Sequence, residues 1–277
     1  MVSENSPGLR VMSWNVNSVR RRLSQVGRLA RVLRPDVLCL QETKVADDFF
    51  PRDAFLRLGY EHQIVLGQGG YNGVAILSRR RLEARPVRRW RGKEDKRHLS
   101  ATVEIAPGGR EVELHCFYVP SGGGVASRER NPKYDDKLRF LSAMTRWSRT
   151  LDAETPRLLV GDLNVAWLET DVWNHETARR SVGHTDLERE SFGRMVRAGG
   201  WTDLERERVP AAEFHFSWWT YRHPGAFGAG RGWRLDYALG SPGLAPYVVG
   251  TDTVSRVRGW KGPSDHAPIV VDLDEGD

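Results

Sequence analysis

Cysteine is nearly absent from this sequence. The 277 residues contain only Cys39 and Cys116, each inside an apolar stretch. Two buried thiols exclude a disulfide framework and a zinc site built from thiolates, and they indicate a reducing compartment, the cytoplasm. Long hydrophobic runs are also missing, since none approaches the roughly 18–20 residues that cross a bilayer. The polar residues 1–9 lack the apolar core of a secretory signal, so we expect a protein with no membrane association.

Lysine is scarce as well. Only six of the 42 basic residues are lysine and the other 36 are arginine, and 36 acidic residues leave a formal net charge of +6. The planar guanidinium of arginine binds phosphate in a bidentate manner, so this composition favours a polyanionic partner. A source whose proteins are generally rich in arginine would give the same composition. The charge composition therefore does not decide between a polyanionic partner and an arginine-rich source.

Repeats, low-complexity tracts and long linkers are missing too, so we expect one domain, 10–274, after a flexible N-terminal segment, 1–9. Short β-branched runs alternate with helical patterns, which predicts an α/β (α+β) protein with two sheets packed face to face under outer helices. Helical spacing predicts helices over 17–34, 138–147 and 192–196, with Asn17 or Ser18 as the first N-cap and Pro35 ending that helix. Strands are predicted at Val11–Trp14, Val37–Leu40, Gly73–Ser78, Ala101–Ile105, Glu111–Val119, Leu158–Val160, Leu235–Leu239 and Ile269–Leu273.

Polar side chains interrupt the apolar strands at five places. An amide, Asn15, ends the first strand, and a carboxylate, Glu42, follows the second. The other three places hold Asp162 with Asn164, Asp236, and Asp265 with His266. Each of these alone is more simply a turn or a cap. Together they suggest convergence on one site, because strand ends meet at one rim of a sheet.

The types of these residues point to a hard metal ion. One Glu, three Asp, two Asn and one His form an oxygen-rich set without cysteine. Such ligands suit Mg²⁺, with Mn²⁺ as an alternative, whereas Zn²⁺ would normally recruit more His or Cys. The sequence has no Gly-x-Ser-x-Gly elbow, no Walker loop and no dinucleotide-binding glycine motif after a strand. The pattern therefore favours metal-assisted hydrolysis of a phosphoester.

Eight segments, in this order, resemble the exodeoxyribonuclease III branch of the endonuclease/exonuclease/phosphatase superfamily. They are SWNVNSVR (13–20), RPDVLCLQETKV (34–45), NGVAILSR (72–79), FYVPSG (117–122), GDLNVA (161–166), SWWTYR (217–222), GWRLDYALGS (232–241) and PSDHAPI (263–269). The resemblance runs nearly end to end. It implies a four-layer, DNase-I-like sandwich of two packed mixed β-sheets flanked by helices, with the site where strand ends of both sheets meet.

The resemblance also implies roles for individual residues. Glu42 is similar to the family's principal metal ligand, with Asn15 beside it, and Asp162 would orient and deprotonate the attacking water. Asn164 would hold that water or the scissile phosphate, and Tyr118 would place its phenol on the same phosphate. The metal ligands implied in this way are Asn15, Glu42, Asp162, Asn164, Asp265 and His266, with Asp265 either at the metal or just behind it.

His266 would donate a hydrogen bond to the phosphate oxygen whose negative charge grows in the transition state. Asp236 resembles the family residue that hydrogen-bonds this imidazole and fixes its orientation. A cation, a carboxylate base and an oriented histidine form a consistent apparatus for phosphodiester hydrolysis. The catalytic residues implied by resemblance are Tyr118, Asp162, Asn164, Asp236 and His266.

Contacts with DNA follow from the same resemblance. Trp218, Trp233 and Leu235 would line a small pocket that receives a flipped sugar without a base, and packing in the core is the competing explanation for such aromatic residues. Arg20, at the start of the first helix, would meet a backbone phosphate or would simply face solvent. Ser121 and the segment 183–192 depart from the family pattern, which leaves the balance of exonuclease and endonuclease activity open.

The function implied is that of a monomeric, Mg²⁺-dependent DNA repair nuclease without an obligate protein partner. It would hydrolyse the phosphodiester 5′ to an abasic site in duplex DNA and remove nucleotides or blocking groups from 3′ ends. One alternative is a phosphoesterase of the same fold that acts on another phosphate ester. The other is a DNA-binding protein without catalytic activity, which the complete set of Glu, Asp, Asn and His residues disfavours.

Overall fold

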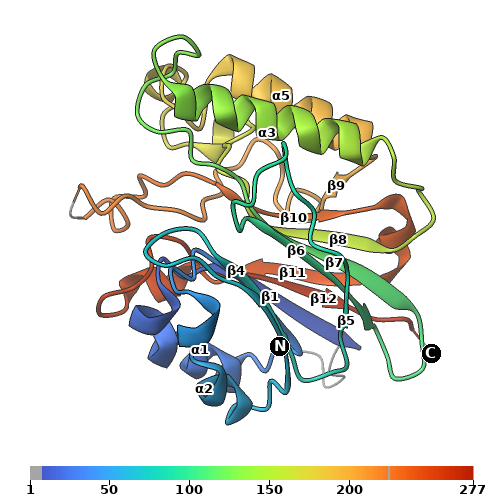
Figure 1. Cartoon of the computed structure of the whole chain (residues 1–277). Helices are drawn as coiled ribbons and strands as arrows, with labels where there is room; N and C mark the ends of the chain where they lie inside the picture. The colour runs from blue at the N-terminus through green and yellow to red at the C-terminus, as the bar shows by residue number, and fades with distance from the viewer. Residues whose placement is uncertain (1–7, 224, 277) are drawn as a thin grey trace.

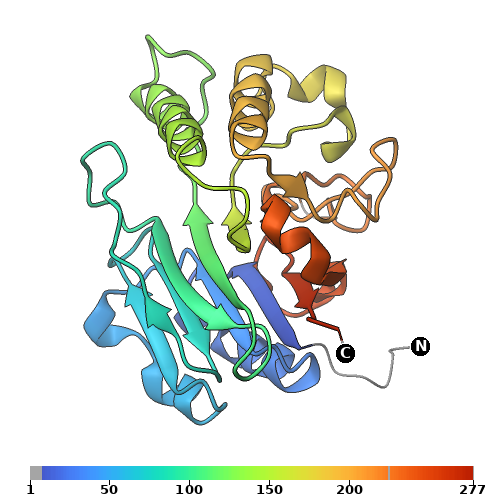
Figure 2. The same ribbon diagram turned by 90° about the vertical axis from the view of Figure 1, so that its right-hand side faces the viewer.

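Two β-sheets lie face to face between two layers of helices (Figures 1 and 2). The computed structural model describes residues 8–223 and 225–276. Helices α3 (Pro132–Ser148) and α5 (Asp186–Ala198) cover one sheet, and α1 (Val19–Val32) and α2 (Arg52–Leu56) cover the other. The predicted four-layer sandwich is confirmed. Of the expected N-terminal segment, residues 1–7 lie outside the described residues, and Leu9 already begins the first strand.

The first sheet has the strand order β11-β12-β1-β2-β4-β3. β1 and β2 are parallel, and the other neighbours are antiparallel. Its strands are β1 (Leu9–Asn15), β2 (Val37–Gln41), β3 (His62–Leu66), β4 (Val74–Ser78), β11 (Val248–Thr253) and β12 (Ile269–Leu273).

The second sheet has the order β5-β6-β7-β8-β10-β9, and only its β7 and β8 are parallel. Its strands are β5 (Glu83–Ala84), β6 (His98–Glu104), β7 (Glu111–Tyr118), β8 (Arg157–Asp162), β9 (Thr202–Asp203) and β10 (Asp236–Gly240). Short helical turns complete the described chain: η1 (Asp47–Phe49), η2 (Glu169–Asp171), α4 (His175–Ala178), η3 (Pro242–Tyr247) and η4 (Ser255–Gly259).

The eight predicted strands and three predicted helices are all present, with shifted ends. The N-cap of α1 is one of the two residues predicted for it. Ser18 occupies that position, but its side chain makes no capping hydrogen bond. Its backbone N–H instead donates to the carbonyl oxygen of Glu42 at 2.8 Å, and Val19 donates to Thr43. The turn after β2 therefore fixes where α1 begins.

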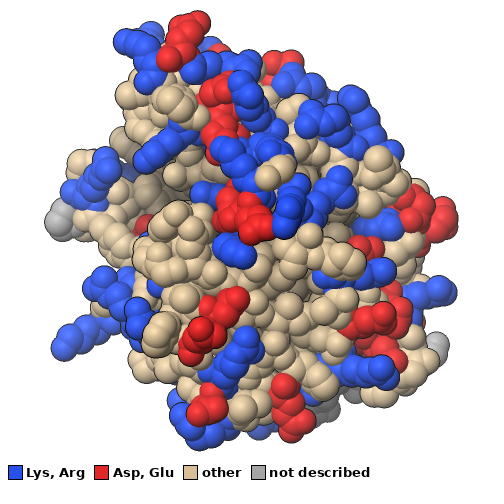
Figure 3. Space-filling view, in the orientation of Figure 1, with Lys and Arg blue, Asp and Glu red and all other residues tan. Residues whose placement is uncertain are grey.

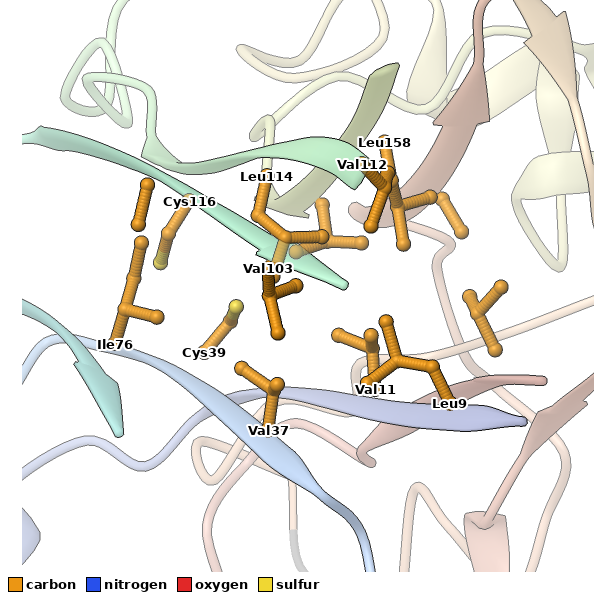
Figure 4. Close-up of a cluster of buried hydrophobic side chains, with 14 of the residues drawn as sticks. Leu9, Val11, Val37, Cys39, Ile76, Val103, Val112, Leu114, Cys116 and Leu158 are labelled. Carbon is orange, nitrogen blue, oxygen red and sulfur yellow. The ribbon is translucent and has the colours of Figure 1, made fainter. Parts of the chain in front are cut away.

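A hydrophobic core fills the space between the two sheets. Side chains of β7, including Leu114 and Cys116, face Val37 and Cys39 of β2 across this space (Figure 4). Both cysteines are buried free thiols, as the sequence predicted. Close packing of the two sheets against each other prevents one from sliding over the other, so the ends of their strands occupy fixed relative positions. Over residues 8–223 and 225–276, the helices are too short or too polar to cross a membrane.

The strands bring the polar residues of both sheets to one end of the sandwich. In the first sheet Asn15 ends β1 and pairs with Gln41, which ends β2 and precedes Glu42. In the second sheet Tyr118 ends β7 and pairs with Asp162, which ends the parallel β8. Asp236 begins the antiparallel β10 opposite Asp162. β12 also runs antiparallel to β1, so the segment before it, which carries His266, lies at the same end.

Candidate active site

The strand ends open into a cavity of about 560 Å³. Nine of the twelve residues singled out in the sequence line it: Glu42, Tyr118, Asp162, Asn164, Trp218, Trp233, Leu235, Asp265 and His266. Asn15 and Asp236 are buried and contact the lining residues from behind. Arg20 does not reach this cavity; it lies on the exposed face of α1 and lines a different hollow, between α1 and α2. Its contact with DNA stays a prediction.

Glu42, Asp162 and His266 form a compact cluster within the cavity. One ligand atom from each lies within 4.8 Å of the other two. Asn15 Nδ2 donates hydrogen bonds to Glu42 Oε1 at 2.9 Å and to Asp162 Oδ2 at 2.8 Å. Asn15 Oδ1 accepts from the backbone N–H of Asn17. Asn15 therefore fixes the two carboxylates in place, and its own oxygen is turned away from them.

His266 is held between two carboxylates. Its Nδ1 hydrogen-bonds Asp236 Oδ2 at 2.8 Å, and its Nε2 lies 3.7 Å from Asp162 Oδ2. Burial disfavours the imidazolium, but Asp236 and Asp162 outweigh burial and raise the pKa of His266 to about 10. Ser217 Oγ donates to Asp236 at 2.6 Å and keeps that carboxylate oriented. His266 is thus arranged as a hydrogen-bond donor facing the cavity.

The electrostatics of the cluster suit a bound cation. Burial raises the pKa of Asp162 to about 7, and the carboxylates of Asp236 and Glu42 add to the rise while His266 opposes it. Lys44 Nζ lies 2.6 Å from Glu42 Oε2 and neutralises part of the negative charge. A hard divalent ion beside Glu42 and Asp162 would relieve the remaining repulsion, because carboxylate oxygens are its preferred ligands. The donor set therefore fits Mg²⁺ or Mn²⁺.

Asp265 lines the cavity but lies outside this three-residue cluster. Its Oδ1 accepts a hydrogen bond from Asn17 Nδ2 at 2.9 Å, and its Oδ2 accepts from Trp218 Nε1 at 3.0 Å. Both carboxylate oxygens are thus engaged by side chains. Asp265 anchors the Trp218 indole, and its part in holding a metal stays a prediction.

Tyr118 and Asn164 complete the polar wall. Burial raises the pKa of Tyr118 well above its ordinary value, and the charges of Glu42 and Asp162 raise it further, so the phenol stays protonated. Asn164 donates its backbone N–H to Asp162 Oδ1 at 2.9 Å and its side-chain Nδ2 to the carbonyl oxygen of Val119. Gly161, the residue before Asp162 in β8, allows the close pairing with β7, because a Cβ there would lie 2.0 Å from the carbonyl oxygen of Phe117.

Aromatic residues form the opposite wall. Trp218 and Trp233 pack edge to face with their ring centroids 6.2 Å apart, and Leu235 is buried beside them. The Trp218 backbone forms bridges with both Trp233 and His266. The aromatic wall therefore directly adjoins the imidazole, and its use as a sugar pocket stays a prediction.

Sequence reasoning missed several supporting residues. Lys44 and Ser217 bind the carboxylates of Glu42 and Asp236, and Asn17, expected only as a cap, binds Asp265 and Lys44. Each lies in or beside one of the eight segments that resemble the family, so its place in such a segment could have marked it as a site residue. No local pattern indicates which side chains these residues contact. Basic residues provide no further guide, since Lys and Arg are spread over the face in Figure 3 and interspersed with Asp and Glu.

Comparison with known proteins agrees with this geometry. The model of the Endonuclease/Exonuclease/phosphatase family matches residues 12–266. The DNA repair nuclease APEX1 of Danio rerio is 34% identical over 273 residues, which cover 96% of this chain and 82% of that protein. An exodeoxyribonuclease of Bacillus subtilis is 31% identical over 266 residues, which cover 94% of this chain and 98% of that protein.

Solved structures of DNA-cleaving enzymes are also similar to this chain. An AP endonuclease from Archaeoglobus fulgidus is similar with a TM-score of 0.86 and 32% identity, over 96% of this chain and 99% of that chain. A 3′-5′ exonuclease from Neisseria meningitidis has a TM-score of 0.84 and 31% identity, over 96% of this chain and 100% of that chain. The resemblance inferred from the eight sequence segments is confirmed. The chain belongs to the endonuclease/exonuclease/phosphatase family.

Proposed function

We propose that this protein is a Mg²⁺-dependent DNA repair nuclease that hydrolyses the phosphodiester 5′ to an abasic site and removes nucleotides or blocking groups from 3′ ends. The observation that carries the proposal is one cavity in which the Glu42–Asp162–His266 cluster adjoins the Trp218–Trp233 wall. The named relatives support it, since they include an AP endonuclease, an exodeoxyribonuclease and a 3′-5′ exonuclease. All the site residues come from one chain, so a monomer suffices.

The cavity residues divide the chemistry among them. Glu42, with Asp162 beside it, would hold Mg²⁺, which supplies positive charge against the phosphate oxygens when bound. Asp162 accepts the proton of the attacking water, and hydrogen bonds from Asn15 Nδ2 and the backbone N–H of Asn164 hold its carboxylate in place for this step. His266 Nε2 and the Tyr118 phenol donate hydrogen bonds to the phosphate, while Asp236 keeps the imidazole charged and oriented.

Cleavage of a defined substrate tests this function. The purified protein is incubated with a duplex carrying a single abasic analogue, in Mg²⁺ and in excess EDTA. We expect one cut, 5′ to the abasic position, that leaves a 3′-hydroxyl and occurs only with Mg²⁺. Equal cutting in EDTA, or no cutting with Mg²⁺, contradicts the proposal. A protein that hydrolyses a simple phosphodiester such as bis(p-nitrophenyl) phosphate as fast as abasic DNA would be the alternative phosphoesterase.

The aromatic wall carries a separate prediction about specificity. Trp233→Ala enlarges the cavity where a sugar with a base is excluded. The ratio of kcat/KM for abasic over intact duplex should fall about 10–100-fold, the range expected for one lost apolar contact surface. Trp260→Ala, outside the cavity, is the matched control and should keep the ratio. A wild-type ratio in Trp233→Ala would show that another surface selects the abasic site.

A further inference from the structure

A lysine and a glutamate are fully buried together behind the cavity. Lys137, on α3, and Glu188, on α5, are each 0% exposed, and Lys137 Nζ lies 2.5 Å from Glu188 Oε1. Neither residue lines the cavity. Removing two charges from water is costly, and an apolar pair of similar volume is often at least as stable. The pair therefore calls for an explanation beyond the stability of the helix layer.

The ammonium group of Lys137 donates hydrogen bonds to two loops that line the cavity. Besides Glu188, Lys137 Nζ donates to the carbonyl oxygen of Asn164 at 2.6 Å and to that of Ser121 at 3.4 Å. A lysine ammonium has three N–H donors, and these three acceptors use all of them. Ser121 follows β7 and Asn164 follows β8, so one side chain joins the two loops that flank Tyr118 and Asp162.

The carboxylate is bonded to a third loop of the cavity. Glu188 accepts the backbone N–H of Gly183 at 2.9 Å and both the N–H and the hydroxyl of Thr185, at 3.2 and 2.7 Å. Gly183 lies against the Trp233 ring, where a Cβ on Gly183 would be 3.1 Å from Cζ3. Glu188 thus fixes the segment that supports the aromatic wall.

We propose that Lys137 and Glu188 are positioning residues that hold three loops, around Ser121, Asn164 and Gly183, at the spacing needed for phosphate and sugar to be seated together. The proposal rests on the proposed function, because it concerns the same cavity. The Lys137 ammonium holds the loops of the polar wall, and the Glu188 carboxylate holds the segment that supports the aromatic wall. The ion pair therefore sets the distance between the two walls. Displacement of such loops by about 1 Å can slow an enzyme 100-fold without removing any reacting group.

The double variant Lys137→Met with Glu188→Gln tests this. It removes both charges, so no buried ion is left unpaired, and the glutamine carbonyl can still accept from Gly183. The Ser121 and Asn164 loops lose their donor. We expect kcat on abasic duplex to fall about 10–100-fold with KM changed less than about threefold, because phosphate contacts elsewhere provide binding.

Hydrogen exchange provides a readout that does not depend on the reaction. Peptides covering 119–124 and 163–166 should exchange about 10-fold faster in the double variant, whereas 181–186 should change less. The matched control is Arg157→Met with Glu113→Gln, another ion pair with little exposure, at the opposite end of β8. It should lower the melting temperature without lowering kcat.

Three outcomes separate the possibilities. Slow turnover with loosened 121 and 164 loops supports the proposal. A variant that melts lower but keeps both wild-type kcat and wild-type exchange in these loops overturns it and leaves the pair a structural role only. Absence of abasic-site cleavage by the wild-type protein would refute the proposed nuclease function, and the exchange data would still decide whether the pair holds the loops.

Discussion

Asp162→Asn should slow the cleavage of abasic duplex by about 1000-fold, in the middle of the range for a lost general base. The amide cannot accept the proton of the attacking water, but it keeps the shape of the side chain and an oxygen for the N–H of Asn164. The amide NH2 cannot accept the hydrogen bond from Asn15 Nδ2, but burial penalises the ionised carboxylate, as its raised pKa shows, and relief of that penalty offsets the loss, so the fold should be kept. Single-turnover rates, DNA affinity and the melting temperature are the measurements.

The expected pattern for Asp162→Asn is a lost rate, an unchanged affinity for DNA and an unchanged or higher melting temperature. Asp252→Asn, the same chemical change at an exposed position of β11, is the control and should match the wild type in all three. An Asp162→Asn protein that unfolds would identify Asp162 as a structural residue. One that retains wild-type turnover would place the base elsewhere.

Glu42→Gln is expected to lower the rate at millimolar Mg²⁺ by about 100–1000-fold, comparable to the loss of one major electrostatic contact in an active site. The amide removes a negative charge from the centre of the predicted ligand set and leaves Lys44 without its carboxylate partner. Rates measured across a Mg²⁺ series should show a half-saturation point displaced to higher concentration. Glu61→Gln, at an exposed position before β3, is the matched control. A Mg²⁺ dependence identical to the wild type would exclude Glu42 as a ligand.

The strands recognised from the sequence are the interior ones. Each of the eight predicted strands has a hydrogen-bonded neighbour on both sides, whereas β3, β5, β9 and β11 are the four edges of the two sheets. Interior strands are covered on both faces and read as continuous apolar runs. The edges read differently: β11 is part-buried or exposed throughout, and β5 and β9 have two residues each. Strands that are this short or this exposed carry no continuous apolar run, so local patterning could not reveal them.

The active site likewise has residues that the sequence revealed and contacts that it did not. Residues at strand ends, such as Glu42 and Asp162, were found because a polar group after an apolar run is visible locally. The contacts between sheets were not visible, because the Asn15 to Asp162 bond spans 147 residues. Lys137 and Glu188 are 51 residues apart on two polar helices, where such side chains normally face solvent. Only the packing of α3 on α5 shows that both are buried.

Anomalous diffraction from crystals soaked in Mn²⁺ is the most direct measurement of the metal centre on which this account depends. We predict one strong peak about 2.2 Å from a carboxylate oxygen of Glu42, within reach of Asp162 and on the cavity side of His266. The peak should disappear in Glu42→Gln crystals soaked identically. Mn²⁺ bound elsewhere, with no density beside Glu42 and Asp162 at a concentration that supports cleavage, would contradict the account.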